Sequence, residues 1–117
     1  MNALTNIYSV LNNLIGFNVI YGEPVTETTD PLITVSSAEG DEAEALLGYN
    51  SVIYSVISVK VYSAVYLTGY NKIQSVTNEL KGAGAPQIGA TFKKNCGSKY
   101  DKDKQKYIFE VQYKELN

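Results

Sequence analysis

The segment SVIYSVISVKVYS, residues 51–63, most constrains the fold, because apolar and polar side chains alternate along it. One face of this segment carries Ile57, Val59 and Val61. The other face carries Val56, Ser58, Lys60 and Tyr62. Such alternation is typical of a strand with one buried face and one wetted face, the usual arrangement in antiparallel sheets. The segment therefore predicts a long strand in a mainly antiparallel sheet.

Two other segments carry apolar side chains at helical spacing and predict helices. The first covers residues 3–15. The second covers residues 68–81, with Thr68 as the expected N-cap and Gly82 as the residue just beyond its end. The stripe of the second helix that faces the core is expected to comprise Tyr70, Ile73, Val76, Thr77 and Leu80.

Further strands are predicted on both sides of these segments. FNVIYG (17–22) and LITVSS (32–37) have the composition of short strands. GAGAP (82–86) predicts a flexible break after the second helix. QIGATFKKN (87–95) and QKYIFEVQYKEL (105–116) then predict a C-terminal hairpin, with the lysine-rich stretch between them as its turn.

A chain of 117 residues is long enough for one domain with its own core. The order of elements predicts a single α+β domain over residues 1–117, with four to five mainly antiparallel strands and two helices on one face of the sheet. The apolar run of residues 52–67 is interrupted by Ser and Lys, so no membrane span is expected. The N-terminus has no basic residue before its apolar ones, unlike a secretory signal.

The composition argues against most catalytic sites. The chain has no His, and its one Cys, Cys96, therefore lacks the partner of a Cys–His nucleophile. GAGAPQIG (82–89) follows a predicted helix, whereas a dinucleotide-binding loop opens one. DKDKQKYIFEVQ (101–112) has Lys106 and Gln112 where a calcium loop needs Gly and Glu. No enzymatic activity, cofactor or metal is expected.

Charge is distributed unevenly along the chain. The first 59 residues contain seven acids and no Lys, and the remainder contains ten Lys and five acids, for a net charge of −2. The acidic stretch AEGDEAEALLGYN (38–50) is expected to be an exposed loop, and KKNCGSKYDKDKQKY (93–107) carries six Lys. The residues expected to contact a partner are Glu39, Asp41, Glu42 and Glu44, and Lys93, Lys94, Lys99, Lys102 and Lys104.

Three interpretations of the lysines remain open. They keep a protruding hairpin soluble and block edge pairing, they bind nucleic acid with Tyr100 and Tyr107 as stacking platforms, or they contact an acidic protein surface. The chain has no Arg, which usually provides bidentate phosphate contacts, and its pI is about 5.0. Partner contact is favoured over nucleic acid on these grounds, and a second copy of the chain is the expected partner.

The order of elements also resembles the tail terminator, or tail-completion, proteins of long-tailed bacteriophages. The likeness covers nearly the full length. The segments that carry it are ALTNIYSVLNNL, FNVIYG, DPLITVSS, SVKVYS, YNKIQSVTNELKG and YIFEVQY. The acidic stretch 38–50 is longer than the turn that the family usually has there, so no individual residue role is transferred.

The resemblance implies a structural virion protein that performs no chemistry. Members of the family usually form a six-fold ring that caps the tail tube, ends its polymerisation and offers a docking surface for the head. The implied partners are other copies of the chain, the tail tube protein and the head–neck connector proteins, with DNA only passing through the ring. The implied location is the head-proximal end of the virion tail, and the host cytoplasm during assembly. The alternatives are a head–tail connector, a tube protein or a small nucleic-acid-binding module.

Overall fold

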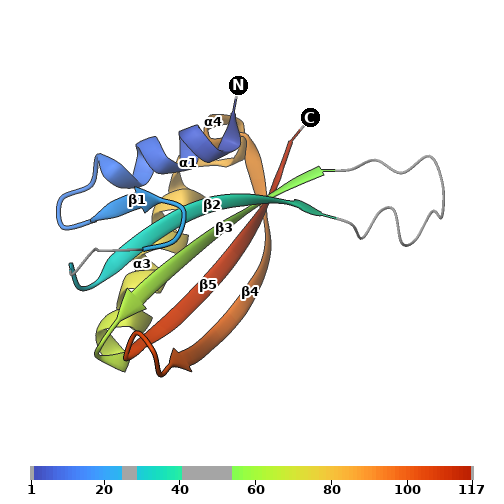
Figure 1. The fold of residues 1–117 in the computed structure, drawn as a ribbon. Helices are drawn as coiled ribbons and strands as arrows, with labels where there is room; N and C mark the ends of the chain where they lie inside the picture. The colour runs from blue at the N-terminus through green and yellow to red at the C-terminus, as the bar shows by residue number, and fades with distance from the viewer. Residues whose placement is uncertain (1, 25–28, 41–53, 117) are drawn as a thin grey trace.

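A five-stranded sheet with the order β1-β2-β3-β5-β4 forms the frame of the protein (Figure 1). The computed structural model describes residues 2–24, 29–40 and 54–116. Its strands are β1 (Val19–Tyr21), β2 (Leu32–Gly40), β3 (Tyr54–Ser63), β4 (Ala90–Asp101) and β5 (Lys106–Glu115). Only β1 and β2 pair in parallel, and the other neighbours pair antiparallel. The predicted α+β fold with a mainly antiparallel sheet is confirmed.

The helices α1 (Ala3–Asn12), α3 (Tyr66–Ala83) and α4 (Ala85–Ile88) pack against the sheet and share one core with it (Figure 1). The predicted inward face of β3 contributes to this core through Ile57, Val59 and Val61. The core residues from the helices are Ala3, Ile7, Leu11, Ile73, Val76, Leu80 and Ile88. The period-two pattern of β3 therefore identified the buried face correctly, since strand side chains alternate between the two sides of a sheet.

The opposite face of the sheet carries a smaller buried cluster of Leu32, Tyr62 and Ile108. The Tyr62 hydroxyl donates a 2.9 Å hydrogen bond to Glu23, which follows β1. Glu23 also pairs with Lys60, at 3.4 Å between Nζ and Oε1. This side of the sheet is thus half polar, as the alternation along β3 predicts.

The boundaries of the two long helices differ from those predicted. α1 ends at Asn12 and not at residue 15. α3 begins at Tyr66 with Val65 at the N-cap, so the prediction of Thr68 as the N-cap was wrong. The Ser63 side chain explains the earlier start, because its hydroxyl accepts a hydrogen bond from the Val65 N–H and donates one to the Val65 carbonyl.

The end and the inner stripe of α3 also differ from the prediction. Gly84, not Gly82, stands just past the end, with a φ of 86° that an L side chain rarely adopts. Tyr70 is 43% exposed and does not belong to the inner stripe. Gly69 takes the buried position, because a Cβ there would lie 2.5 Å from the Phe109 ring. The close approach of the helix to β5 rotates Tyr70 outward.

The segments around α4 and the hairpin require two corrections. GAGAP is not a flexible break, since Ala85–Ile88 form α4 with Pro86 in its first turn, where proline is tolerated. The hairpin turn is also shorter than predicted: β4 continues to Asp101, and only residues 102–105 form the turn. Asp101 explains this, because its carboxylate accepts hydrogen bonds from the N–H groups of Asp103 and Lys104.

The acidic stretch was predicted as a loop over residues 38–50. Residues 38–40 belong instead to β2, where they pair with residues 54–56 of β3. Residues 41–50 lie outside the described residues. In the part of the chain that the structure describes, no helix has the length and apolar character needed to cross a membrane.

Candidate interaction surface

The structure places the predicted lysines on one hairpin but not at one point. Lys93, Lys94 and Lys99 lie along β4, and Lys102 and Lys104 lie in the turn. β4 is an edge strand, exposed over most of its length, with register shifts near Lys94 and Gly97. Lysines and bulges are features that protect an exposed edge from unwanted strand pairing. Of the predicted acids, Glu39 lies in β2, and Asp41, Glu42 and Glu44 lie outside the described residues.

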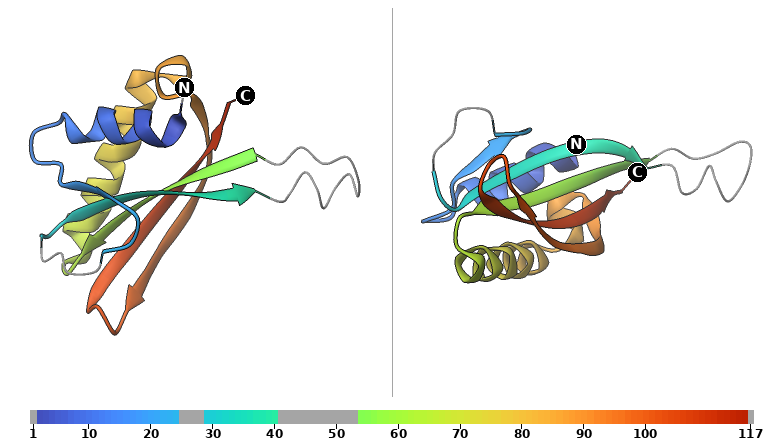
Figure 2. Two further views of the ribbon diagram at one scale, coloured as in Figure 1. Left: turned by 45° about the horizontal axis from the view of Figure 1, so that its top comes forward. Right: turned by 60° about the horizontal axis from the view of Figure 1, so that its bottom comes forward.

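The turn between β4 and β5, which contains Lys102 and Lys104 and which we call the lysine turn, lies at the opposite end of the sheet from the end of β2 (Figure 2). Glu39 belongs to that end of β2. Glu39 pairs with Ser55 near the end of β2, whereas Lys99 pairs with Ile108 close to the turn. Ile108 of β5 pairs with Tyr62 of β3, and Tyr62 pairs with Leu32 of β2, so the three residues lie in one row across the sheet. Leu32 and Glu39 are seven residues apart on β2, which corresponds to roughly 23 Å at the usual rise of a strand. The backbone of Glu39 therefore lies far from the turn, in the row next to that of Lys114, and Asp101 and Asp103 lie beside the lysines of the turn.

Two of the hairpin lysines pair with acids of the same molecule. The Lys106 ammonium lies 2.6 Å from the Asp30 carboxylate. The Lys104 ammonium lies 4.0 Å from Asp101 within the turn. Lys94, Lys99 and Lys102 are exposed. The basic character of the hairpin is therefore concentrated at fewer side chains than its sequence suggests.

Asp30 is the acidic partner of Lys106 at the turn end of the sheet. Partial burial opposes ionisation of its carboxyl group, but hydrogen bonds from Lys106 and from the Ala64 N–H outweigh burial and lower its pKa. The carboxylate thus joins the segment before β2 to the start of β5 and to the residue after β3. It holds the turn end of the sheet together.

Four tyrosines lie at the end of the sheet that carries the lysine turn. We call these four residues, Tyr66, Tyr70, Tyr100 and Tyr107, the tyrosine cluster. Tyr107 packs edge-on against Tyr100 and Tyr66, with ring centroids 4.9 and 5.4 Å apart. Tyr66 also lies 6.4 Å from Tyr70 in a stacked arrangement. All but Tyr107 are nearly half exposed. Large, rigid tyrosine side chains of this kind are enriched in protein interfaces.

Sequence reasoning found only part of this surface. Tyr100 and Tyr107 were considered as stacking platforms, but Tyr66 and its exposed neighbours Val65 and Leu67 were missed. They were missed because the helix was predicted to begin at residue 68. The apolar pair Val65 and Leu67 on either side of Tyr66, just beyond a strand, was the signal available in the sequence.

Cys96 lies exposed in β4. Partial burial and the charge of Glu110 raise the pKa of its thiol, although Lys94 and Lys93 act in the opposite direction. A raised thiol pKa reduces the thiolate fraction on which nucleophilic reactivity depends. The geometry of Cys96 therefore does not favour a nucleophile.

Within residues 2–24, 29–40 and 54–116, no group of three or more His, Cys, Asp or Glu side chains is placed to hold a metal ion. The exposed features in this part of the chain are the tyrosine cluster, the lysines of the hairpin and the apolar side chains near the start of α3. These features are suited to binding another macromolecule. No protein-family model matches the chain, and a comparison with curated proteins found no match to it either.

Proposed function

We propose that the protein is a structural virion component, a tail terminator that assembles into a ring on the end of the phage tail tube. One observation carries the proposal beyond the resemblance in sequence pattern. The lysine turn and the end of β2 at Glu39 lie at opposite ends of one sheet, so two copies placed head to tail bring these two different segments together. A contact between two different patches of the same chain is heterologous, and it generates a ring when the rotation closes.

The charges alone do not provide enough affinity for such a ring. An exposed ion pair contributes only about 0–1 kcal/mol, and salt screens it. The tyrosine cluster lies at the lysine end and supplies exposed aromatic area. In this proposal the aromatic and aliphatic contacts provide affinity, while the charges set the register of neighbouring copies and speed their encounter.

The ring would cap the tail tube, stop its polymerisation and present a surface to the head–neck connector proteins. Its partners would be its own copies, the tube protein and those connectors, and it would act by binding alone. We place it at the head-proximal end of the tail, and in the host cytoplasm during assembly. A ring of about six copies is the stoichiometry expected from the resemblance.

Native mass measurement combined with electron microscopy of the purified protein tests this proposal. Closed rings of one defined stoichiometry, which bind the ends of tail tubes and halt their elongation, are the expected result. Open polymers that lengthen with concentration would instead indicate a tube protein. Rings that join heads without affecting tube length would indicate a head–tail connector.

A nucleic-acid-binding module is the second candidate, because exposed Tyr100 lies on the same hairpin as exposed Lys99 and Lys102. Binding of duplex and single-stranded DNA at two salt concentrations distinguishes it. A DNA-binding module would lose affinity steeply with salt, with a logarithmic slope of about −0.9 for each duplex phosphate contacted. The terminator proposal expects only weak binding of DNA.

A further inference from the structure

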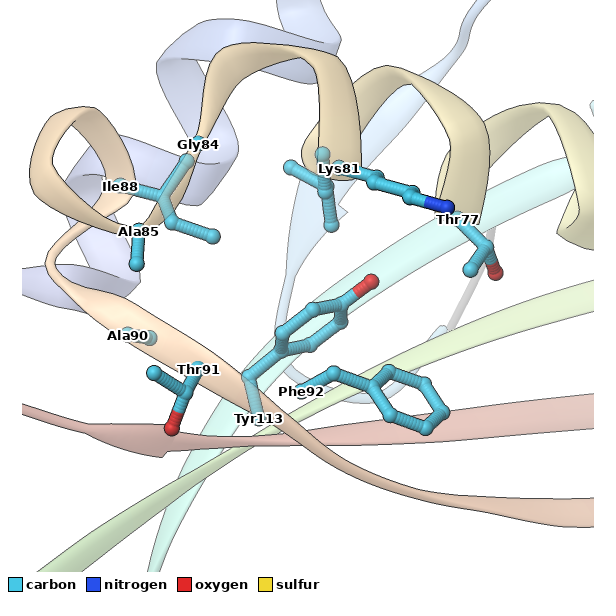
Figure 3. A pocket seen from close by; sticks show the side chains of 10 residues that line it. Thr77, Lys81, Gly84, Ala85, Ile88, Ala90, Thr91, Phe92 and Tyr113 are labelled. Carbon is cyan, nitrogen blue, oxygen red and sulfur yellow. The ribbon is translucent and has the colours of Figure 1, made fainter.

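A cavity of about 460 Å³ lies between the end of α3, the short helix α4 and the beginning of β4 (Figure 3). Most of its wall is apolar, and this part includes the side chains of Leu80, Ala85, Ile88, Ala90 and Phe92. Pockets that bind small molecules typically measure about 300–1,000 Å³ and combine an apolar wall with a few polar groups. The cavity therefore has the size and the apolar character of a small-molecule site.

One polar group in the wall of the cavity is unsatisfied. The Tyr113 side chain is 3% exposed, and its hydroxyl has no hydrogen-bond partner in the described part of the chain. Figure 3 shows this hydroxyl pointing toward the side of the cavity where Thr77 and Lys81 lie. The Thr77 hydroxyl donates its hydrogen to the Ile73 carbonyl, at 2.8 Å. Because buried hydroxyls are nearly always hydrogen-bonded, the cavity has the features of a site that a ligand completes.

Lys81 gives the same side of the cavity a positive charge. It is the one charged residue among the described residues that line the cavity, and it is exposed in the last turn of α3. Within the described segments, no acid forms an ion pair with it. An ammonium group and a phenol hydroxyl both donate hydrogen bonds. A molecule that satisfies both groups must therefore supply an acceptor, and the charge of Lys81 favours a negative one.

We propose that the cavity binds a small apolar molecule that carries one carboxylate group. The carboxylate accepts a hydrogen bond from the Tyr113 hydroxyl and pairs with the Lys81 ammonium, since such hydrogen bonds are stronger when one partner is charged. The apolar body of the molecule lies against Leu80, Ile88 and Phe92. At about 30 Å³ for each water-sized atom, the cavity has room for roughly fifteen non-hydrogen atoms.

Binding requires a rearrangement at the mouth of the cavity, because the Tyr113 hydroxyl is itself buried. The exposed Lys81 side chain has a flexible four-carbon stem, so it can turn outward to admit a carboxylate and then cover it. A site with little water strengthens the hydrogen bond from Tyr113. The same ammonium group repels a cation. Each copy of the chain contains a whole cavity, so this inference does not rest on the proposed ring.

Three matched probes test the inference on the purified full chain. Phenylbutyrate has an aromatic ring and one carboxylate, phenylbutyramide is its neutral counterpart, and phenylbutylamine is its cationic one. NMR titration of the backbone amides gives the Kd of each probe and the position at which it binds. Phenylbutyrate should bind with a Kd at or below about 1 mM, the amide about tenfold more weakly, and the amine without saturation at about 10 mM. The amide shifts should cluster at residues 77–92 and at Tyr113.

Variants of the two polar groups separate their roles. Tyr113→Phe should weaken binding of phenylbutyrate at least about tenfold, because it removes a hydrogen bond to a charged group. Lys81→Met retains the apolar stem and removes the charge, so it should abolish most of the preference for the carboxylate over the amide. Lys102→Met is the matched control, since Lys102 is an exposed lysine in the turn at the other end of the sheet. It should bind the probes as the parent does.

A third variant closes the cavity. Ala85→Trp fills it from α4 and should prevent binding of phenylbutyrate. Circular dichroism checks that each variant folds. If Ala85→Trp does not fold, Phe92→Glu replaces it. This substitution places a negative charge on the half-exposed cavity wall and should weaken binding of phenylbutyrate more than that of phenylbutyramide.

Several outcomes would overturn the inference. One is the lack of saturable binding of phenylbutyrate up to about 10 mM. Equal affinity of the parent for phenylbutyrate and phenylbutyramide would be another. Amide shifts away from the cavity, or binding that Tyr113→Phe leaves unchanged, would show an adventitious contact and would also overturn it. None of these outcomes bears on the ring, which mass measurement and microscopy test separately.

Discussion

The ammonium of Lys106 lies 2.6 Å from the carboxylate of Asp30, and this ion pair joins the first residue of β5 to the segment that leads into β2. Both side chains are less than one third exposed. Asp30 also accepts a hydrogen bond from the Ala64 N–H, at 2.9 Å. Three chain segments therefore depend on one carboxylate at the end of the sheet that carries the lysine turn and the tyrosine cluster.

Replacing Asp30 by Asn should destabilise the protein in a pH-dependent way. Folding lowers the pKa of Asp30 from its usual value of 3.8. The ionised carboxylate therefore stabilises the fold fully above about pH 4, and this stabilisation is lost as the pH falls through the folded-state pKa. We expect the variant to lose about 1 kcal/mol of unfolding free energy at pH 7. Urea unfolding at pH 7 and near pH 2 measures the difference, and an equal loss at both pH values would contradict this account.

Adding a methyl group at Gly69 should disturb the packing of α3 on the sheet. A Cβ at this position would lie 2.5 Å from Cε1 of Phe109 and 3.0 Å from Cβ of Ser63. Gly69→Ala should therefore cost about 1–3 kcal/mol through overpacking. Gly82→Ala is the matched control in the same helix, since nothing lies within 4 Å of its Cβ, and it should be neutral or stabilising by up to about 1 kcal/mol. Thermal unfolding of both variants gives the comparison.

Removing the Tyr113 hydroxyl should stabilise the monomer. Burial raises the pKa of Tyr113 to about 12, although the nearby Thr77 side chain offsets part of the shift. An unsatisfied buried hydroxyl costs about 1–3 kcal/mol, so Tyr113→Phe should recover part of this free energy. Tyr62→Phe should do the opposite and lose about 1 kcal/mol, because it removes the hydrogen bond to Glu23. Denaturant unfolding at low protein concentration separates these effects from assembly.

Reversing the charge of the lysine turn should impair assembly. Lys99, Lys102 and Lys104 lie at the end of the sheet opposite Glu39, and in the proposed ring they would meet the Glu39 end of a neighbouring copy. Replacing all three by Glu should weaken ring formation more than replacing them by Gln does, and low salt should favour assembly of the parent. Sedimentation at two salt concentrations measures both effects. If the Glu variant forms rings as well as the parent does, the charges do not set the register.

Residue pattern alone identified the hairpin lysines but not their arrangement. Lys93, Lys94, Lys99, Lys102 and Lys104 lie on the predicted C-terminal hairpin, but Lys99 belongs to β4 and not to the turn. The separation of Lys93 and Lys94 from the turn depends on the length of β4, which the Asp101 turn determines. The pairing of Lys106 with Asp30 joins residues 76 positions apart, and no local pattern reports such a contact.

The sequence by itself determined the α+β class, the buried face of β3, and the lack of a His that a Cys–His nucleophile would need. These follow from side-chain periodicity and composition, which are properties of neighbouring residues. Only the tertiary structure decided where α3 begins, why Gly69 rather than Tyr70 faces the core, and that a cavity and an exposed Leu67 lie at opposite ends of one helix. These depend on contacts between distant segments, because the space around a side chain is set by what the rest of the fold packs against it.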